Sequence, residues 1–209
     1  MTIFVLFRKL SFTKALTNLL LLLIIAFGYS CNNTEYYPKP RGYIRIELPE
    51  KSYRKFDSVF PYSFEYPKYA NINFDGLDPI NKYWMNIDYK KYHGKIHVSY
   101  KSLDKQELYR FTEDAREMAF KHAAKAVGIK ESVYSNPKKQ VYGLTYRIEG
   151  RDAASPFQFY LTDSTQHFVR GALYFNVVPN NDSLQPVIDY ILADINHLFE
   201  TFEWEDSGK

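Results

Sequence analysis

Cysteine is almost absent from this 209-residue sequence, whose single cysteine is Cys31. One cysteine excludes an internal disulfide and a paired-thiol site. Acidic residues are absent before Glu35, whereas Arg8, Lys9 and Lys14 carry positive charge there. Long apolar runs are also lacking, because the longest run, Leu19–Phe27, has nine residues. A membrane-spanning helix needs roughly 20, so this run is too short to predict one.

The first thirty residues have the features of a secretory signal peptide. A basic start precedes the apolar run, and Gly28, Tyr29 and Ser30 lead into Cys31. This junction resembles the lipobox of bacterial lipoproteins, although Leu is usual where Gly28 stands and Tyr29 is bulky. We therefore predict a signal peptide at residues 1–30 and lipidation of Cys31 with fatty acyl chains such as palmitate, which anchor firmly when two or more are present. An uncleaved N-terminal anchor and a buried, inert thiol are the alternatives.

Loss of the signal peptide removes the apparent basic character of the chain. It takes three of the 27 basic residues and leaves 24 against 24 acidic residues. A net charge near zero gives no general attraction to nucleic acid, so no nucleic-acid partner is predicted. The 179 residues that remain of the 209 suit one domain with a hydrophobic core. We expect an extended, proline-containing tether at residues 31–42 and a single globular domain at residues 43–205.

Alternating apolar and polar residues predict strands along much of this domain. The predicted strands are Tyr43–Leu48, Tyr62–Tyr66, Tyr69–Phe74, Tyr83–Lys90, Lys95–Lys101, Gln140–Glu149, Pro156–Thr162 and Gln166–Val178. Gly94 is expected to supply the turn conformation between the fourth and fifth strands, and Asp163–Thr165 a hairpin turn between the last two.

Two segments have helical character. Thr112–Val127 is rich in alanine, with Thr112 as its expected cap and Gly128 as its stop. Ser183–Phe202 has a broad apolar face and carries Pro186 in its first turn, and Asp182 or Ser183 is its expected cap. That apolar face consists of Leu184, Val187, Ile188, Ile191, Ile195, Leu198, Phe199 and Phe202.

Short turns between strands favour antiparallel pairing, and two amphipathic helices can cover the resulting sheet. The predicted fold class is therefore α+β, with a central antiparallel β-sheet covered by two main helices. The order of elements also resembles the Mog1/PsbP-type α/β sandwich. That resemblance rests on topology, and it implies a fold without implying a function.

Motifs that carry catalysis or bind cofactors are missing. There is no glycine-rich phosphate loop, no GxSxG elbow and no HExxH motif. His93 and His97 straddle Gly94 at a predicted turn, which disfavours the ligand geometry that the same spacing has on a helix. We predict no catalytic residues, no metal site and no cofactor. Structural roles are expected for His122, His197, Asp152 and Asp163.

Two segments resemble the GldD-type gliding-motility lipoproteins of the Bacteroidetes. They are Tyr37–Glu50, and Arg170–Leu184 leading into Pro186–Ile191. The resemblance extends from Pro38 to about Trp204 and agrees with the lipoprotein start. It implies an envelope accessory protein needed for gliding and for type IX secretion, with other gliding and secretion proteins as its partners. It brings no established catalytic residues.

The predicted function is that of a non-enzymatic envelope lipoprotein which supports gliding motility and type IX secretion. The alternative is a periplasmic small-molecule-binding or hydrolytic lipoprotein, although no small-molecule substrate is identified. Asn32 follows Cys31, and Glu35 is the only acid nearby, so there is neither an Asp retention signal nor an acidic surface-export run. These features predict membrane attachment at the periplasmic face of the outer membrane.

The segment after Cys31 is also the predicted partner-binding site. Fixed proline backbones lose little entropy on binding, and Arg and Tyr are enriched at interfaces. The candidate residues are Pro38, Pro40, Arg41, Tyr43 and Arg45. The alternative is that the prolines only stiffen a spacer while Tyr43 packs on the sheet.

Overall fold

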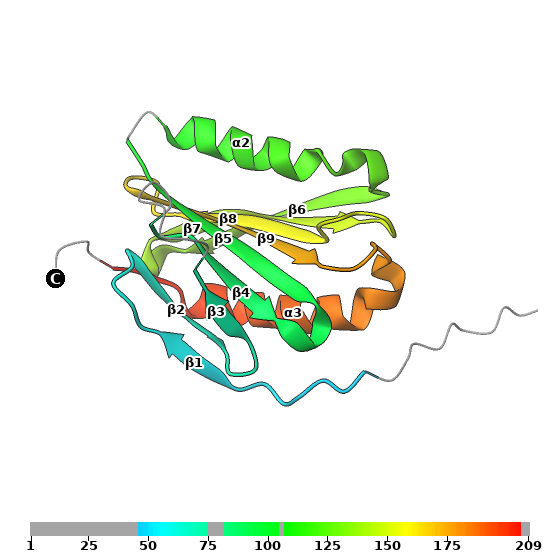
Figure 1. Ribbon diagram of the computed structural model, residues 1–209. Coiled ribbons are helices and arrows are strands. Elements are labelled where there is room, and N and C mark those ends of the chain that lie inside the picture. Colours follow the sequence, from blue (N-terminus) through cyan, green and yellow to red (C-terminus); the bar gives the residue numbers. More distant parts are fainter. Residues whose placement is uncertain (1–45, 75–81, 105–106, 206–209) are drawn as a thin grey trace, which may run out of the picture. The chain divides into compact units, whose positions relative to one another are not determined.

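A seven-stranded antiparallel sheet lies at the centre of the computed structural model, which describes residues 46–74, 82–104 and 107–205, all within the unit Tyr43–Lys209. Helix α2 covers one face of this sheet (Figure 1). Helix α3 and a smaller three-stranded sheet lie on the other face (Figure 1). The α+β class with an antiparallel sheet and two main helices is therefore confirmed.

The large sheet is built mostly from hairpins between neighbouring strands. Its order is β3 (Asn71–Asn73), β4 (Met85–Tyr89), β5 (Gly94–Ser102), β9 (His167–Phe175), β8 (Phe157–Thr162), β7 (Val141–Glu149) and β6 (Gly128–Asn136). The smaller sheet has the order β1 (Tyr53–Phe56), β2 (Tyr62–Pro67) and β10 (Glu203–Trp204). The strands predicted from Tyr62 onward are present, with ends that differ from the prediction by at most three residues.

Helix α3 spans Asn181–Thr201, close to the predicted Ser183–Phe202. Its predicted apolar face is buried or packed against the core, and the helix accepts Pro186 near its start. The predicted caps Asp182 and Ser183 are wrong, because both residues lie inside the helix and Asn180 precedes it. The side chain of Asn181 fixes this end instead, since its amide donates hydrogen bonds to the carbonyls of Gly150 and Ala153.

Helix α2 spans Leu108–Phe120 and so begins four residues before the predicted Thr112. Thr112 lies inside the helix, where its hydroxyl donates a hydrogen bond to the carbonyl of Tyr109. The early start packs the partly buried Leu108 and Phe111 against Phe168, a contact that helix propensity does not report.

The predicted C-terminal half of α2 is also corrected. Gly128 is the first residue of strand β6 rather than a helix stop. Helix α2 ends at Phe120 and a short 3-10 helix follows at Ala123–Lys125. The backbone N–H of Val127 then bonds the Glu149 carbonyl, so the chain joins the sheet instead of continuing the helix. Strands β6 and β1 had no predicted counterpart, because both are edge strands whose mostly exposed residues lack alternation.

Two further expectations fail near the first hairpin. Within the predicted strand Tyr43–Leu48, the described residues Ile46–Leu48 do not form a strand, because side chains rather than a neighbouring strand bind their backbone. Gly94 does not make the turn: His93 has the left-handed conformation, with φ of 52°. A Cβ on Gly94 would lie 3.1 Å from Cδ1 of Ile191, so this glycine allows α3 to approach the sheet closely.

Candidate functional site

A buried carboxylate lies in the middle of helix α3. Asp194 is 2% exposed and shares the inner face of the helix with Ile191, Ile195 and Leu198. A buried charge is unfavourable unless it is paired and hydrogen-bonded. The partners of Asp194 therefore identify which part of the chain this helix binds.

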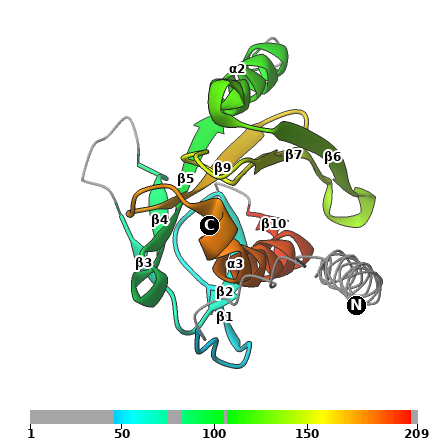
Figure 2. The same cartoon turned by 90° about the vertical axis from the view of Figure 1, so that its right-hand side faces the viewer.

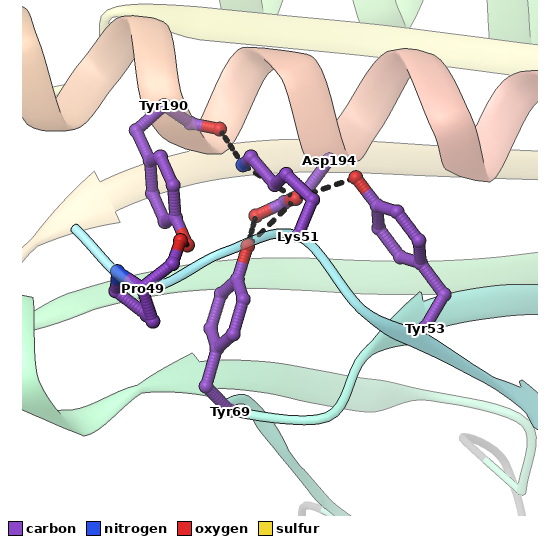
Figure 3. A network of polar contacts seen from close by, with 6 residues as sticks. All are labelled: Pro49, Lys51, Tyr53, Tyr69, Tyr190 and Asp194. Carbon is purple, nitrogen blue, oxygen red and sulfur yellow. Dashed lines mark hydrogen bonds and ion pairs between the residues drawn. The ribbon is translucent and has the colours of Figure 1, made fainter.

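Three side chains from the first described residues donate to this carboxylate (Figure 3). The Nζ of Lys51 lies 2.7 Å from Oδ1 and the Tyr53 hydroxyl 3.1 Å from the same oxygen. The hydroxyl of Tyr69 lies 2.9 Å from each carboxylate oxygen. Lys51 precedes β1, Tyr53 begins it, and Tyr69 lies between β2 and β3, so the network joins α3 to both segments.

Aromatic contacts hold the lysine in place. The Lys51 ammonium lies 3.3 Å from the ring centroid of Tyr190 and donates to the Tyr190 carbonyl at 2.6 Å. The Tyr190 ring stacks on Tyr69 at 5.4 Å, and its hydroxyl donates to the Pro49 carbonyl at 2.7 Å (Figure 3). Residues 49–53 are thus bound at both ends to one turn of α3.

Burial and the Asp194 carboxylate shift the pKa values of the residues in this network. Burial lowers the pKa of Lys51, and the hydrogen bond and charge of Asp194 oppose that shift. Burial raises the pKa of Tyr53 and of Tyr69, and the nearby Asp194 carboxylate raises both further. Both phenols therefore stay neutral donors near neutral pH. The group can hold an ammonium–carboxylate pair in a fixed place.

Hydrogen bonds extend this attachment along the chain in both directions. The carbonyl of Glu47 accepts from the Tyr92 hydroxyl at 2.9 Å and from the Lys91 ammonium at 3.1 Å. On the other side, the His197 ring stacks on Tyr53 at 3.6 Å and its Nε2 lies 2.7 Å from a Glu65 carboxylate oxygen. We call residues 47–53 with these partners the anchor segment.

The residues singled out from the sequence fall outside this geometry. Cys31 and the predicted docking residues lie outside the described ranges, and the latter are Pro38, Pro40, Arg41, Tyr43 and Arg45. Sequence reasoning missed the Asp194 network. One signal was available, because an aspartate three residues after Ile191 and four before Leu198 interrupts an apolar helix face.

Three further candidate residues, His93, His97 and Asp163, lie in turns or in a strand. His93 lies at the turn before β5, and His97 lies within that strand. The predicted Asp163 turn is confirmed, since Oδ1 of Asp163 accepts from the backbone N–H groups of Thr165, Gln166 and His167. Among the described residues, no group of three or more His, Cys, Asp or Glu side chains could hold a metal ion. No helix in the described ranges is both long and apolar enough to span a bilayer.

A solved structure and a protein-family model are similar to this chain. The solution structure of cyanobacterial PsbP (CyanoP) from Synechocystis sp. PCC 6803 aligns with 12% identity and a TM-score of 0.43, covering 77% of this chain and 97% of that one. No curated protein sequence matches the chain. The family model described as gliding motility lipoprotein GldD matches residues 33–204, which confirms the resemblance of Tyr37–Glu50 and Arg170–Leu184. The chain belongs to the GldD family of gliding motility lipoproteins.

Proposed function

We propose that the protein is a lipid-anchored, non-enzymatic component of the cell envelope that supports gliding motility and type IX protein secretion. The family match over residues 33–204 carries this proposal. In it, residues 1–30 are a cleaved signal peptide, Cys31 carries the acyl chains, residues 31–42 are the tether and residues 43–205 are the domain. Its partners are other gliding and secretion proteins of the envelope.

The anchor segment supports a mechanical role for this arrangement. It is the first described part of the chain after the proposed tether, and it is bound to α3 through Lys51 and Asp194. Helix α3 is in turn packed into the main hydrophobic core. A pull on the tether would therefore act on a helix packed into the main core before it reached the edge strand β1.

Lipidation is tested by Cys31→Ser. The variant should take up no labelled palmitate and should no longer fractionate with membranes, while Asn32→Ser beside it should leave both properties unchanged. A Cys31→Ser protein that still takes label and still sediments with membranes contradicts the proposed anchor.

Orientation is tested by adding protease to intact cells. Attachment at the periplasmic face of the outer membrane predicts that the protein survives until the outer membrane is permeabilised. Digestion in intact cells would place it at the surface and contradict the proposed location.

The proposed docking role of the tether is tested by a double substitution. Arg41→Glu with Tyr43→Ala should abolish spreading or secretion while abundance and melting temperature stay normal. Lys55→Glu with Tyr109→Ala is the matched control, because it changes one exposed cation and one exposed tyrosine elsewhere. Full activity of the Arg41 and Tyr43 variant would show that the segment is only a spacer.

A further inference from the structure

Helix α2 covers only part of its face of the large sheet. It packs on β8 and β9 through Ala115 and Ala119, whereas β3 and β4 lie away from it (Figure 2). The side chains that β4, β5 and β9 direct to this face beyond α2 are mainly polar. They differ in kind from the apolar residues under the helix.

Strand register brings these polar residues into one row. Asn86 of β4 pairs with His97 of β5, His97 with Ala172 of β9, and Ala172 with Gln158 of β8. The small side chain of Ala172 lies between larger neighbours, and a hollow of about 300 Å³ opens beside it. Its polar and aromatic lining consists of Trp84, Asn86, His97, Ser99, Arg170 and Tyr174.

Buried amide atoms in this row have no partner. Asn86 and Gln158 are each 1% exposed. Both amide atoms of Asn86 and Nε2 of Gln158 have no hydrogen bond to any described residue. Buried polar atoms nearly always have a partner, and Asn86 lines the hollow, so its unpaired amide indicates an occupant that supplies donors and acceptors.

The charge of the hollow is positive. Arg170 is half-buried, and its Nη2 donates to Gln158 Oε1 at 2.6 Å. Within the described ranges it has no ion pair with a carboxylate, whereas the nearby Asp88 lies 3.6 Å from Lys95. Lys101 is outside the lining, but its ammonium lies 5.4 Å from the ring centroid of Trp84, which is part of it. A guanidinium removed from water favours a planar carboxylate, which it can bind through two parallel hydrogen bonds.

We propose that this hollow binds the carboxylate of a compact, hydrogen-bonding molecule. Arg170 holds the carboxylate, and the Asn86 amide pairs with a hydroxyl or amide group of the same ligand. Trp84 and Tyr174 form its aromatic walls. An acidic monosaccharide and the C-terminus of a short peptide share this chemistry, and the volume of the hollow suits one sugar or two amino-acid residues.

Binding can be measured through the fluorescence of Trp84, because the chain has only one other tryptophan, Trp204. The full chain carrying Trp204→Phe, purified in detergent, is titrated with D-glucuronate against D-glucose and with glycylglycine against its C-terminal amide. At least one acid should bind ten times more tightly than its neutral counterpart. A preference for glucuronate identifies a sugar ligand, and a preference for glycylglycine identifies a peptide ligand.

Variants then locate the site. Arg170→Gln should weaken acid binding at least tenfold, and Arg110→Gln, an exposed arginine of α2 that pairs with Glu107, should leave it unchanged. In the unaltered protein, the same acid should shift the side-chain amide NMR signals of Asn86 and Gln158, a readout that does not depend on the variant folding. Equal binding of acids and neutral counterparts, no binding of either, or unmoved amide signals would show a water-filled hollow and overturn the proposal.

Discussion

The two faces of the seven-stranded sheet are built differently. Under α3, large aromatic and aliphatic side chains form one continuous core, in which Phe202 stacks on Tyr62 at 5.7 Å and on Phe64 at 6.3 Å. Under α2, two small clusters centre on Ala115 and Ala119, and the polar hollow lies beyond them on β4, β5 and β9. Apolar burial, the main stabilising contribution to folding, is thus concentrated on one face.

The apolar side chains that contribute most to stability and the polar side chains of the hollow therefore lie on opposite faces of the sheet. The face that contributes less apolar burial is also the one that carries the unpaired amide atoms and Arg170. The anchor segment also lies on the α3 side of the sheet. Matched substitutions on the two faces test whether stability depends mainly on the α3 side.

The largest effect is expected from removing a core ring under α3. Phe199 is buried and lies 4.8 Å from Phe159 and 5.2 Å from Tyr134, ring to ring. Phe199→Ala should lower the free energy of unfolding by about 4 kcal/mol. Phe111→Ala on α2, where the ring is partly exposed, should cost about 1.5 kcal/mol. Equal losses in urea unfolding would contradict the asymmetry.

The next effect concerns the buried charge of α3. Asp194→Ala removes the acceptor of Lys51, Tyr53 and Tyr69 and should cost about 3 kcal/mol. Asp189→Ala, one turn away, removes an exposed ion pair with Arg147 and should cost about 0.5 kcal/mol. Hydrogen exchange should show the released backbone around Lys51. Unchanged protection there would mean that the network does not hold the anchor segment.

A smaller effect tests how tightly the α3 face is packed. A Cβ at Gly171 would lie 2.1 Å from Cζ of the buried Phe159 ring, so Gly171→Ala should cost about 2 kcal/mol through overpacking. Gly128→Ala is the control, because nothing lies within 4 Å of its Cβ position. Thermal unfolding of both variants measures the difference, and a neutral Gly171→Ala would indicate a loosely packed face.

The smallest effect belongs to the β8–β9 turn at the end of the sheet. Burial alone would raise the pKa of Asp163, but hydrogen bonds from Thr165, Gln166 and His167 lower it overall. Because the folded pKa is depressed, this stabilisation is present above the ordinary carboxyl pKa and is lost as pH falls through the folded value. Asp163→Asn should therefore cost about 1 kcal/mol at pH 7 and progressively less below about pH 4. A pH-independent difference in melting temperature would exclude the ionised carboxylate as the cause.

The contrast between α3 and α2 also explains which elements the sequence predicts well. The continuous apolar face of α3 matches its burial, so periodicity located it to within two residues at its start. Helix α2 buries only Ala115 and Ala119, and its boundaries depend on Phe168 and on the backbone of Glu149. Contacts this distant in the chain leave no local pattern.

The fold class, the hairpins with alternating residues, the long apolar helix and the family could all be predicted from the sequence. These follow from local periodicity, turn chemistry and two recognisable segments. Two contacts emerge only in the folded protein: Asp194 meets Lys51, and Asn86 shares a row with Gln158. The first pair is 143 positions apart in the chain, and the second is set by the register of four strands. Burial and strand register act between distant residues, so a one-dimensional pattern cannot specify these contacts.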